Sequence, residues 1–451
     1  MNFSKLKLSK EMLQNLDAIG YERMTQIQAD ALPFILDGKD VIAQAKTGSG
    51  KTATFGIGLL EKLDVKKFRI QTLVLSPTRE LADQVAKELR NLAKFKHNIK
   101  ILTLCGGASF NAQVSSLAHH AHIVVGTPGR LLKHLKKGTL NLEHLNTLVL
   151  DEADRMLDMG FIEDIQTLLT HAPKDRQTLL FSATYTDEVL AISKTLQRDA
   201  VEVKTTSKES SNKIDEQFFL VEESKKVDTL IKLFYKFKPK NVIVFTNTKI
   251  QAKELAEDLS SSKIDALAIH GDLEQYDRDD VLVQFSNSSC PILVATDVAA
   301  RGLDIKELCM VVNYDIPNTI ETYTHRIGRT ARAGEKGIAI TLYNPYDDIT
   351  DYEDDKRTFS DTKMLENVKN FEMKPQNVTL VIEGGKRDKL RAGDILGALT
   401  SDKTLQGSSI GKIDIYNRQS YVAIQREFIE KAHQKLSKDK IKNKNFSVWI
   451  L

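Results

Sequence analysis

The octet "AKTGSGKT", Ala45 to Thr52, directly follows the apolar stretch "DVIAQ" and has the residue types of a phosphate-binding loop. In such a loop the backbone N–H groups wrap the phosphates, the lysine reaches the β- and γ-phosphates, and the final hydroxyl faces Mg²⁺. Ala45 stands where a glycine is usual. The residues expected to hold the nucleotide phosphates are Thr47, Gly48, Ser49, Gly50, Lys51 and Thr52. For the octet alone, a chance loop of small residues is the alternative.

A second group of chemically active side chains ends the apolar run "LVLDEAD", Leu148 to Asp154. Adjacent acids at the end of a strand are what a phosphate-bound Mg²⁺ needs. Asp151 is expected to hold the metal together with Thr52, and Glu152 to orient and polarise an attacking water. Solvated loop acids are the alternative, but they do not account for a phosphate-binding loop in the same chain. The two groups together predict hydrolysis of a nucleoside triphosphate.

Short apolar runs that alternate with longer helical patterns must position these groups. Four runs in the first half are "TLVLSP", "HIVVGTP", "TLVLDEAD" and "TLLFSAT". Runs that are apolar throughout indicate strands covered on both faces, and such parallel α/β sheets bind ligands at the carboxyl ends of their strands. After a polar stretch, Thr205 to Lys213, the pattern restarts with "NVIVFTNT", "ALAIHGD", "PILVATD" and "MVVNYD". We therefore predict two α/β domains, residues 1–206 and 207–345.

The remainder of the chain is predicted to hold a linker and a small third domain. Residues 346–376 open acidic, contain few strand formers and are interpreted as an acidic linker. Residues 377–451 contain the strand candidates "VTLVIE", "IGKIDIY", "SYVAIQ" and "NFSVWIL", with helices starting near Gly393 and Arg426. The resulting βαββαβ order is that of a ferredoxin-like sandwich, the topology of RNA-recognition modules, although unrelated proteins share it.

The positive charge of the chain is concentrated in this third domain. Residues 378–451 hold 14 Lys and Arg against 8 Asp and Glu, whereas the whole chain has a net charge of only +3. "EGGKRDKLRAGDILGALT", Glu383 to Thr400, combines several of these cations with glycines like a second phosphate loop, but it lacks strand-end acids to hold a metal. The charge indicates a module that binds a polyanion, with a solvated lysine-rich surface as the alternative.

Composition excludes several other classes of protein. Hydrophobic residues at 41% and charged residues at 28% are typical of a folded soluble chain. No apolar run approaches the roughly 18 residues of a membrane helix, and "MNFSKLKLSKEMLQNL" lacks the apolar region of a signal peptide. Cys105, Cys290 and Cys309 are isolated and lack metal-ligand spacing. We expect a cytoplasmic protein with buried, reduced thiols and no membrane contact.

Many further motifs, in order, make residues 1–345 resemble the DEAD-box RNA helicases, whose core consists of two RecA-like domains. Phe3 and "GYERMTQIQ" resemble the adenine-reading motif, in which Gln28 contacts the edge of adenine and Phe3 stacks on it; Met24 replaces the usual proline. "SAT" resembles the motif that couples hydrolysis to strand separation, which implies coupling roles for Asp154, Ser182 and Thr184. "PTREL", the pair Gly106–Gly107 and "TPGR" resemble RNA-binding motifs. The implied RNA contacts are Thr78, Arg79, Gly107, Thr127, Gly129 and Arg130.

The resemblance continues through the second domain. "VFTNT" and "QYDR" resemble RNA-backbone motifs, and "ATDVAARGLDI" resembles a motif that contacts both RNA and the ribose of the nucleotide. These imply RNA contacts from Thr246, Arg278 and Thr296, and ribose contacts from Gly302 and Asp304. "HRIGRTAR" resembles the last motif, with Ala331 in place of the usual glycine. We expect the spacing of Arg326 and Arg329 to place both on one helical face, pointing at the γ-phosphate, with His325 in the coupling network.

The expected catalytic residues are divided between the two domains: Lys51, Asp151 and Glu152 in the first, and His325, Arg326 and Arg329 in the second. Hydrolysis would then require ATP to close the two domains, and an arginine finger supplies about 10³–10⁵ in rate. Closure would also align two half-sites for single-stranded backbone, which favours local strand separation without base readout. The alternatives are an ATP-gated RNA clamp or scaffold without productive unwinding and, less favoured, a DNA helicase.

The third domain resembles the RNA-binding domain of the DbpA group of DEAD-box proteins, through "IEGGKRDKLRAGDILGALT", "IGKIDIYNRQSYVAI" and "DKIKNKNFSV". That group binds a hairpin of large-subunit (23S) ribosomal RNA near the peptidyl-transferase centre. The resemblance implies an ATP- and Mg²⁺-dependent RNA helicase that acts as a monomer on pre-ribosomal particles during assembly of the large (50S) subunit. Because the central strands offer only Tyr421 for base stacking, we expect loops and cations to dominate. The expected RNA-binding residues are Lys386, Arg387, Lys389, Arg391, Lys412, Tyr421, Lys440, Lys442 and Lys444.

Overall fold

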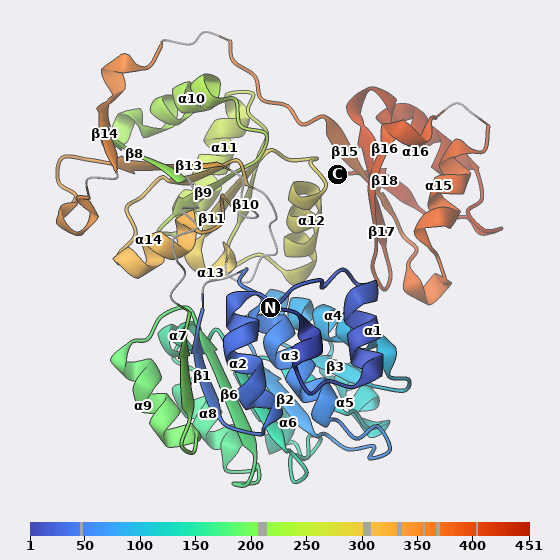
Figure 1. The fold of residues 1–451 in the computed structure, drawn as a ribbon. Coiled ribbons are helices and arrows are strands. Elements are labelled where there is room, and N and C mark those ends of the chain that lie inside the picture. The colour runs from blue at the N-terminus through green and yellow to red at the C-terminus, as the bar shows by residue number, and fades with distance from the viewer. Residues whose placement is uncertain are drawn as a thin grey trace. The chain divides into compact units, whose positions relative to one another are not determined.

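The computed structural model describes residues 1–45, 48–205, 214–300, 308–331, 336–354, 357–366, 370–402 and 405–451. These residues form two compact units, 1–205 and 214–451 (Figure 1). The first unit contains a parallel sheet, and the second contains a parallel sheet and a small antiparallel sheet. The predicted fold class, two parallel α/β domains followed by a small βαββαβ domain, is confirmed. The polar stretch expected between the first two domains lies almost entirely outside the described residues.

The first sheet has seven parallel strands: β1 (Val41–Gln44), β2 (Thr72–Leu75), β3 (Ile101–Leu104), β4 (Ile123–Gly126), β5 (Thr147–Asp151), β6 (Gln177–Ser182) and β7 (Val201–Lys204). Their spatial order is β3-β4-β2-β5-β6-β1-β7. The four predicted apolar runs form β2, β4, β5 and β6, each buried along its whole length. Successive residues enter opposite cores, with Leu73 on one side of the sheet and Val74 on the other, because helices cover both faces.

The helices of this unit are α1 (Lys10–Ala18), α2 (Gln26–Leu36), α3 (Lys51–Lys62), α4 (Arg79–Leu92), α5 (Phe110–Ala118), α6 (Pro128–Lys136), α7 (Ala153–Asp158), α8 (Ile162–Leu169) and α9 (Asp187–Leu196). Polar residues at their starts fix where several of them begin. The side chain of Gln28 accepts a hydrogen bond from the backbone of Thr25 at the start of α2, and Thr78 Oγ1 accepts one from Leu81 N at the start of α4. These capping residues belong to the motifs singled out from the sequence.

The second parallel sheet repeats this design with β8 (Ile214–Leu220), β9 (Val242–Thr246), β10 (Ala266–Ile269), β11 (Ile292–Thr296), β12 (Met310–Asn313), β13 (Gly337–Tyr343) and β14 (Thr358–Asp361). Their spatial order is β10-β11-β9-β12-β13-β8-β14, and all the pairs are parallel. The helices of this domain are α10 (Lys226–Phe237), α11 (Lys249–Ser261), α12 (Gln275–Ser286), α13 (Asp297–Ala300) and α14 (Ile320–Ile327).

The segment expected to be an acidic linker contributes a strand to this sheet. β14 pairs with β8, from Thr358 opposite Gln217 to Asp361 opposite Leu220. Tyr352 and Leu365, which flank β14 in the sequence, are both buried in the domain. β14 lies at the edge of the sheet with most of its residues exposed, so it lacks the apolar run that marks the interior strands.

The third domain follows the predicted βαββαβ order: β15 (Asn377–Ile382), α15 (Ala392–Thr400), β16 (Ile410–Ile415), β17 (Ser420–Gln425), α16 (Ile429–Lys438) and β18 (Val448–Ile450). Its antiparallel sheet has the order β16-β17-β15-β18. Both helices pack on one face, where Ile395, Leu399 and Leu436 close the core. On the opposite face Val381 and Tyr421 pack against Val283 of α12.

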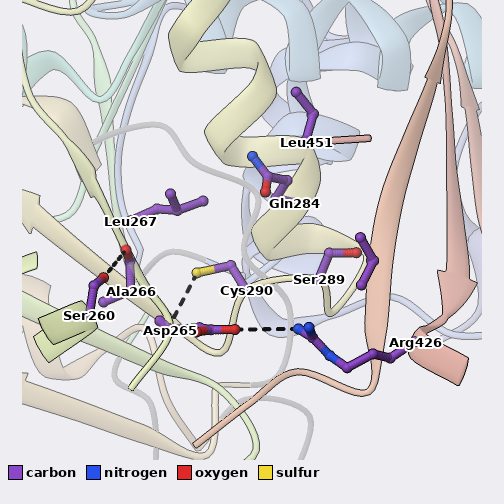
Figure 2. A pocket seen from close by; sticks show the side chains of 10 residues that line it. Ser260, Asp265, Ala266, Leu267, Gln284, Ser289, Cys290, Arg426 and Leu451 are labelled. Carbon is purple, nitrogen blue, oxygen red and sulfur yellow. Dashed lines mark hydrogen bonds and ion pairs between the residues drawn. The ribbon is translucent and has the colours of Figure 1, made fainter. Parts of the chain in front are cut away.

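Polar contacts reinforce this junction between α12 and the third sheet. The Tyr421 hydroxyl donates to Asp280 Oδ1 at 2.7 Å, and Asn287 Nδ2 donates to Thr379 Oγ1 at 2.9 Å. A cavity of about 320 Å³ lies beside it, where Arg426 pairs with Asp265 (Figure 2). Burial raises the pKa of the Cys290 thiol in the cavity wall to about 12, so this thiol is protonated and unreactive. Cys105 is likewise buried, as expected, whereas Cys309 is exposed.

Candidate active site and RNA-binding sites

The phosphate-binding loop connects β1 to α3, which places its backbone N–H groups at a helix N-terminus. Gly50 precedes the helix with φ of +97°, a left-handed conformation suited to glycine. Lys51 is 7% exposed, and neither its Nζ nor Ser49 Oγ has a hydrogen-bond partner among the described residues. Because a buried ammonium without an acceptor is costly, this geometry fits an anionic ligand such as a triphosphate. Gly48 and Thr52 belong to the same loop and helix start, whereas Thr47 lies outside the described residues.

The predicted adenine-reading residue Gln28 lies beside this loop. Gln28 is 1% exposed, and its Oε1 accepts a hydrogen bond of 2.8 Å from Thr25 N. Its Nε2 faces the loop so closely that a Cβ on Gly50 would lie 2.8 Å away. The adenine motif and the phosphate loop are therefore in contact, as a single nucleotide site requires.

Phe3 is placed differently from the expectation that it stacks on adenine. Its side chain is 4% exposed and contacts Tyr21 edge-on, with ring centroids 6.3 Å apart. Burial in the hydrophobic core of the first unit leaves no open ring face for a base.

Asp151 and Glu152 stand at the carboxyl end of β5, directly before α7. Burial raises the pKa of Asp151 to about 7, although the positive charge of Lys51 opposes the shift. A divalent cation would favour the charged carboxylate, so this site fits the expected Mg²⁺. Glu152 has φ of +53° and ψ of +55°, a left-handed conformation that costs a residue other than glycine about 1–3 kcal/mol. Its Oε2 pairs with Arg155 Nε at 3.2 Å but accepts no hydrogen bond from the described residues.

Asp154 links the acidic motif to "SAT". Its Oδ2 accepts hydrogen bonds from Ala183 N at 3.1 Å, Thr184 N at 3.0 Å and Thr184 Oγ1 at 3.0 Å. Ser182, the last residue of β6, is fully buried, and its Oγ has no partner among the described residues. The structure therefore brings Asp154 and Thr184 together, in the arrangement that the coupling prediction requires.

The RNA-binding candidates of the first unit gather around one loop, residues 106–108. Arg79 Nη1 donates to Gly106 O at 2.7 Å, and Arg130 Nη1 donates to Ala108 O at 3.1 Å. Gly107 has a left-handed φ of +74°, which favours glycine, and a Cβ there would displace the Arg79 guanidinium from its present position. Thr78 and Thr127 occupy the N-cap positions of α4 and α6, and Gly129 lies in the first turn of α6. Thr78 therefore has a capping role whether or not it contacts RNA.

Gln113 and His134 support Arg130, a role that the motifs did not reveal. Gln113 Oε1 accepts from Arg130 Nη1 at 2.7 Å and lies 3.0 Å from His134 Nε2. Gln113 Nε2 in turn donates to Cys105 O at 3.0 Å. Both side chains are buried, and the His134 ring stacks on Phe110 with centroids 4.3 Å apart. No motif marked Gln113 or His134, because their burial and their contact with each other appear only in the folded chain.

Lowering the pH is expected to destabilise the first unit through His134. Burial lowers the pKa of His134 to about 4, with further effects from Arg130 and Lys133, whereas an unfolded histidine titrates near about 6.5. Because the unfolded chain takes up the proton first, this contribution to stability is complete above about pH 6.5 and is lost as the pH falls towards about 4. Thermal unfolding midpoints at about pH 7 and about pH 5 should therefore differ less in His134→Gln than in the wild type. An unchanged difference would contradict the prediction, and His144→Gln on the surface serves as the control.

In the second unit, the structure separates the two arginines of "HRIGRTAR". The expectation that they share a helical face is wrong, because α14 ends at Ile327 and Arg329 lies beyond it. Arg326 is 2% exposed and forms a two-pronged pair with Asp297, with Nε–Oδ1 and Nη2–Oδ2 distances of 2.8 Å. Its remaining donors reach Asp315 O at 2.9 Å and Asn247 Oδ1 at 2.8 Å. Arg326 therefore joins the start of α13, which follows β11, to the loops that follow β9 and β12, instead of presenting a free guanidinium to a phosphate.

The other candidates of this domain lie at the same carboxyl edge of the sheet or on nearby helices. Thr246 ends β9 with its side chain buried and its Oγ1 donating to Thr248 O at 3.2 Å. Thr296 ends β11, Arg278 lies in α12 and His325 in α14. Gly302 and Asp304 lie outside the described residues. Asp297, which follows Thr296 directly, was a strand-end acid that sequence reasoning did not single out.

In the third domain most of the predicted RNA-binding cations lie on two loops in contact. Lys442 Nζ donates to Lys389 O at 3.0 Å, and Lys444 Nζ lies 3.9 Å from Asp388 Oδ1. The exposed cations of these loops, called the loop cations below, are Lys386, Arg387, Lys389, Arg391, Lys440, Lys442 and Lys444. Tyr421 and Lys412 are elsewhere: Tyr421 is 2% exposed against α12, and Lys412 Nζ contacts Ser286 Oγ at 3.2 Å. The ring of Tyr421 is thus covered by protein.

Comparison with known proteins identifies the family to which a chain with these sites belongs. Residues 25–192 match the DEAD/DEAH box helicase family, residues 225–334 the helicase conserved C-terminal domain, and residues 379–450 the DbpA RNA binding domain. The ATP-dependent RNA helicase DbpA of Escherichia coli (strain K12) is 49% identical over 460 residues, which cover 100% of this chain and 99% of that protein. This chain is a DEAD-box RNA helicase of the DbpA type.

Other members match about three quarters of the length of this DEAD-box helicase. The DEAD-box ATP-dependent RNA helicase CshA of Geobacillus kaustophilus is 48% identical over 344 residues, 76% of this chain and 73% of that protein. Among solved structures, S. cerevisiae Dbp5 bound to RNA and ADP BeF3 aligns with a TM-score of 0.71 and 31% identity, covering 80% of this chain and 96% of that one. Mss116p bound to ssRNA and AMP-PNP aligns with a TM-score of 0.67 and 28% identity, covering 75% and 73%. The helicase is thus an ATP-dependent, RNA-binding enzyme. Within the described part of the chain, no helix is both long and apolar enough to cross a bilayer.

Proposed function

We propose that this DEAD-box helicase separates short RNA duplexes within 23S ribosomal RNA, directed there by its third domain during assembly of the large (50S) ribosomal subunit. The observation that carries the proposal is the group of loop cations on a DbpA-type RNA-binding domain, attached to a helicase core with a complete set of motifs. The enzyme would act as a monomer in the cytoplasm, on pre-ribosomal particles.

The residues of the first unit suggest how ATP is held and hydrolysed. Lys51 and the loop N–H groups would bind the β- and γ-phosphates, and Gln28 would read the edge of adenine. Asp151 and Thr52 would hold Mg²⁺, which when bound neutralises charge on the phosphate oxygens. Glu152, in its left-handed conformation, would orient the attacking water. Asp154 would couple hydrolysis to the "SAT" motif through its hydrogen bonds with Thr184.

The second unit would complete this chemistry by supplying Arg329 to the γ-phosphate when ATP closes the two domains. Arg326 has a different proposed role, because its donors are held by Asp297, Asp315 and Asn247. Closure would align Arg79, Arg130 and Thr127 of the first unit with Arg278 and Thr296 of the second, so that both grip one RNA backbone. Backbone contacts of this kind carry no sequence information, so specificity must come from the third domain.

Comparing how different RNAs stimulate ATP hydrolysis tests whether the enzyme is directed to ribosomal RNA. Total ribosomal RNA is expected to stimulate the wild-type ATPase more strongly than poly(A), and equal stimulation would contradict the ribosomal target. Lys386→Ala should weaken binding of ribosomal RNA and reduce the slope of log K against log salt by about 0.7, the contribution of one phosphate contact to a single strand. Lys431→Ala, which removes an exposed cation of α16 that is not one of the loop cations, should leave both unchanged.

An ATP-gated RNA clamp without productive unwinding is the second candidate. It would bind RNA in the presence of ATP but release no phosphate and separate no short duplex. Turnover and duplex separation by the wild type therefore distinguish the two functions.

A further inference from the structure

Residues 350–354 and 357–361, called the strap below, lie in the interval between the second and third matched families. They comprise the short 3₁₀ turn Thr350–Tyr352 and the two residues after it, and then Arg357 and the edge strand β14. The strap packs on the β8 side of the second helicase domain, where Phe359 of β14 lies over Phe218 with ring centroids 5.0 Å apart. It is therefore a fixed part of this domain.

Arg357 ties the strap to α14 through Glu216 of β8. Arg357 Nε donates to Glu216 Oε2 at 2.9 Å, and the hydroxyl of Tyr323 in α14 donates to the same oxygen at 2.7 Å. The guanidinium also lies over the Tyr323 ring, 4.8 Å from its centroid. Tyr323 is fully buried and the Arg357 side chain is 13% exposed, so both contacts are largely shielded from water, which strengthens them.

Tyr352 holds the chain just before α14. Its buried hydroxyl donates to Pro317 O at 2.7 Å, and its ring meets the Tyr323 ring edge-on at 5.4 Å. Arg357 Nη1 donates to Tyr352 O at 2.7 Å, so the two strap residues fix each other. The strap thus contacts the chain just before α14, at Pro317, and the middle of α14, at Tyr323.

α14 carries Arg326 and leads directly to Arg329, the proposed arginine finger. We infer that the strap is part of the ATPase machinery, with Arg357 as a positioning residue that holds α14 so that Arg329 meets the γ-phosphate. The inference rests on the proposed role of Arg329. A displacement of about 1 Å in a catalytic group can cost about a hundredfold in rate, which makes a rigid support for a helix of two turns important. Phe218, Tyr352 and Glu216 contribute the surface on which that support is built.

The test compares full-length variants by RNA-stimulated ATP hydrolysis. Arg357→Ala is expected to lower kcat by about ten- to a hundredfold while the KM for ATP and for RNA change by less than about twofold, since it removes neither nucleotide nor RNA contacts. Lys363→Ala is the matched control, because Lys363 lies just after the strap with its side chain 89% exposed and should keep the wild-type kcat. Equal kcat in the two variants would overturn the inference.

Two further variants separate positioning from a loss of folding. Tyr323→Phe keeps the ring and removes only the hydroxyl, so it should remain folded at the assay temperature, with a melting temperature lowered by only a few degrees, and lower kcat by about fivefold. Arg357→Ala added to Arg329→Ala should lower kcat no further, because Arg357 acts through Arg329. A wild-type kcat in Tyr323→Phe, or additive losses in the double variant, would contradict positioning. A wild type that lacks RNA-stimulated ATPase would instead refute the proposed function itself.

Discussion

Replacing Glu152 by glutamine is expected to reduce RNA-stimulated ATP turnover by about 10²–10⁴-fold, the contribution of a positioned general base. Glutamine has nearly the same shape and can adopt the same backbone conformation, but its amide cannot attract a proton from the attacking water. ATP and RNA should still bind, because Lys51, Gln28 and the RNA contacts are unchanged. Release of RNA in the presence of ATP should then become slower, since hydrolysis is what ends the closed state.

The matched control is Glu163→Gln on α8, which makes the same chemical change at an exposed position of the same unit. It should leave kcat at the wild-type value. Phosphate release by Glu152→Gln at the wild-type rate would contradict the role of Glu152. Absence of turnover from the wild type as well would favour the clamp function.

Arg329→Ala and Arg326→Ala are expected to impair the enzyme in different ways, although both remove an arginine from one motif. The first should lower kcat and the second should lower stability. Loss of Arg329, which is 5% exposed, should lower kcat by about 10³-fold or more in the protein that remains folded, as for an arginine finger. Loss of Arg326 should lower the free energy of unfolding of the second unit by about 3 kcal/mol, because Asp297 then loses its two-pronged partner in a largely buried site. Thermal melting and steady-state kinetics on the same samples separate the two effects.

Lys336→Ala provides the control for both arginines, since Lys336 is an exposed cation shortly after the same motif. It should alter neither kcat nor the melting temperature. If Arg326→Ala melted like the wild type and lost only kcat, Arg326 would have to leave Asp297 during the reaction, and its structural role would be refuted.

The interior of the fold could be predicted from sequence because parallel strands covered on both faces require apolar residues at every position. β5 and β11 are examples, and each ends in a polar residue that the sequence singled out, Asp151 and Thr296. β14 was missed because its residues are mostly exposed at the edge of the sheet and carry no such signal. Its pairing with β8 depends on contacts made about 140 residues apart, such as Arg357 with Glu216.

In the candidate site, too, features set by neighbouring residues could be predicted from the sequence, whereas features set by tertiary contacts could not. The loop around Lys51 is a continuous stretch, so its residue types were enough to predict it. The three-residue spacing of Arg326 and Arg329 suggested a shared face, but where α14 ends and which side chain Asp297 holds depend on tertiary packing. Tyr421 could not be assigned for a similar reason, because its covering by α12 comes from a segment about 140 residues away.

β14 also has a consequence for solubility. A parallel strand at the edge of a sheet presents unpaired N–H and C=O groups, which can template pairing with another chain and lead to aggregation. In this domain β14 covers β8, whose seven residues would otherwise form a longer edge, and β14 itself is short and mostly exposed. A chain shortened after Tyr343 would keep every helicase motif and still expose β8 along its length. Self-association is therefore the expected fate of the isolated helicase core when it is cut at the boundary that the motifs suggest.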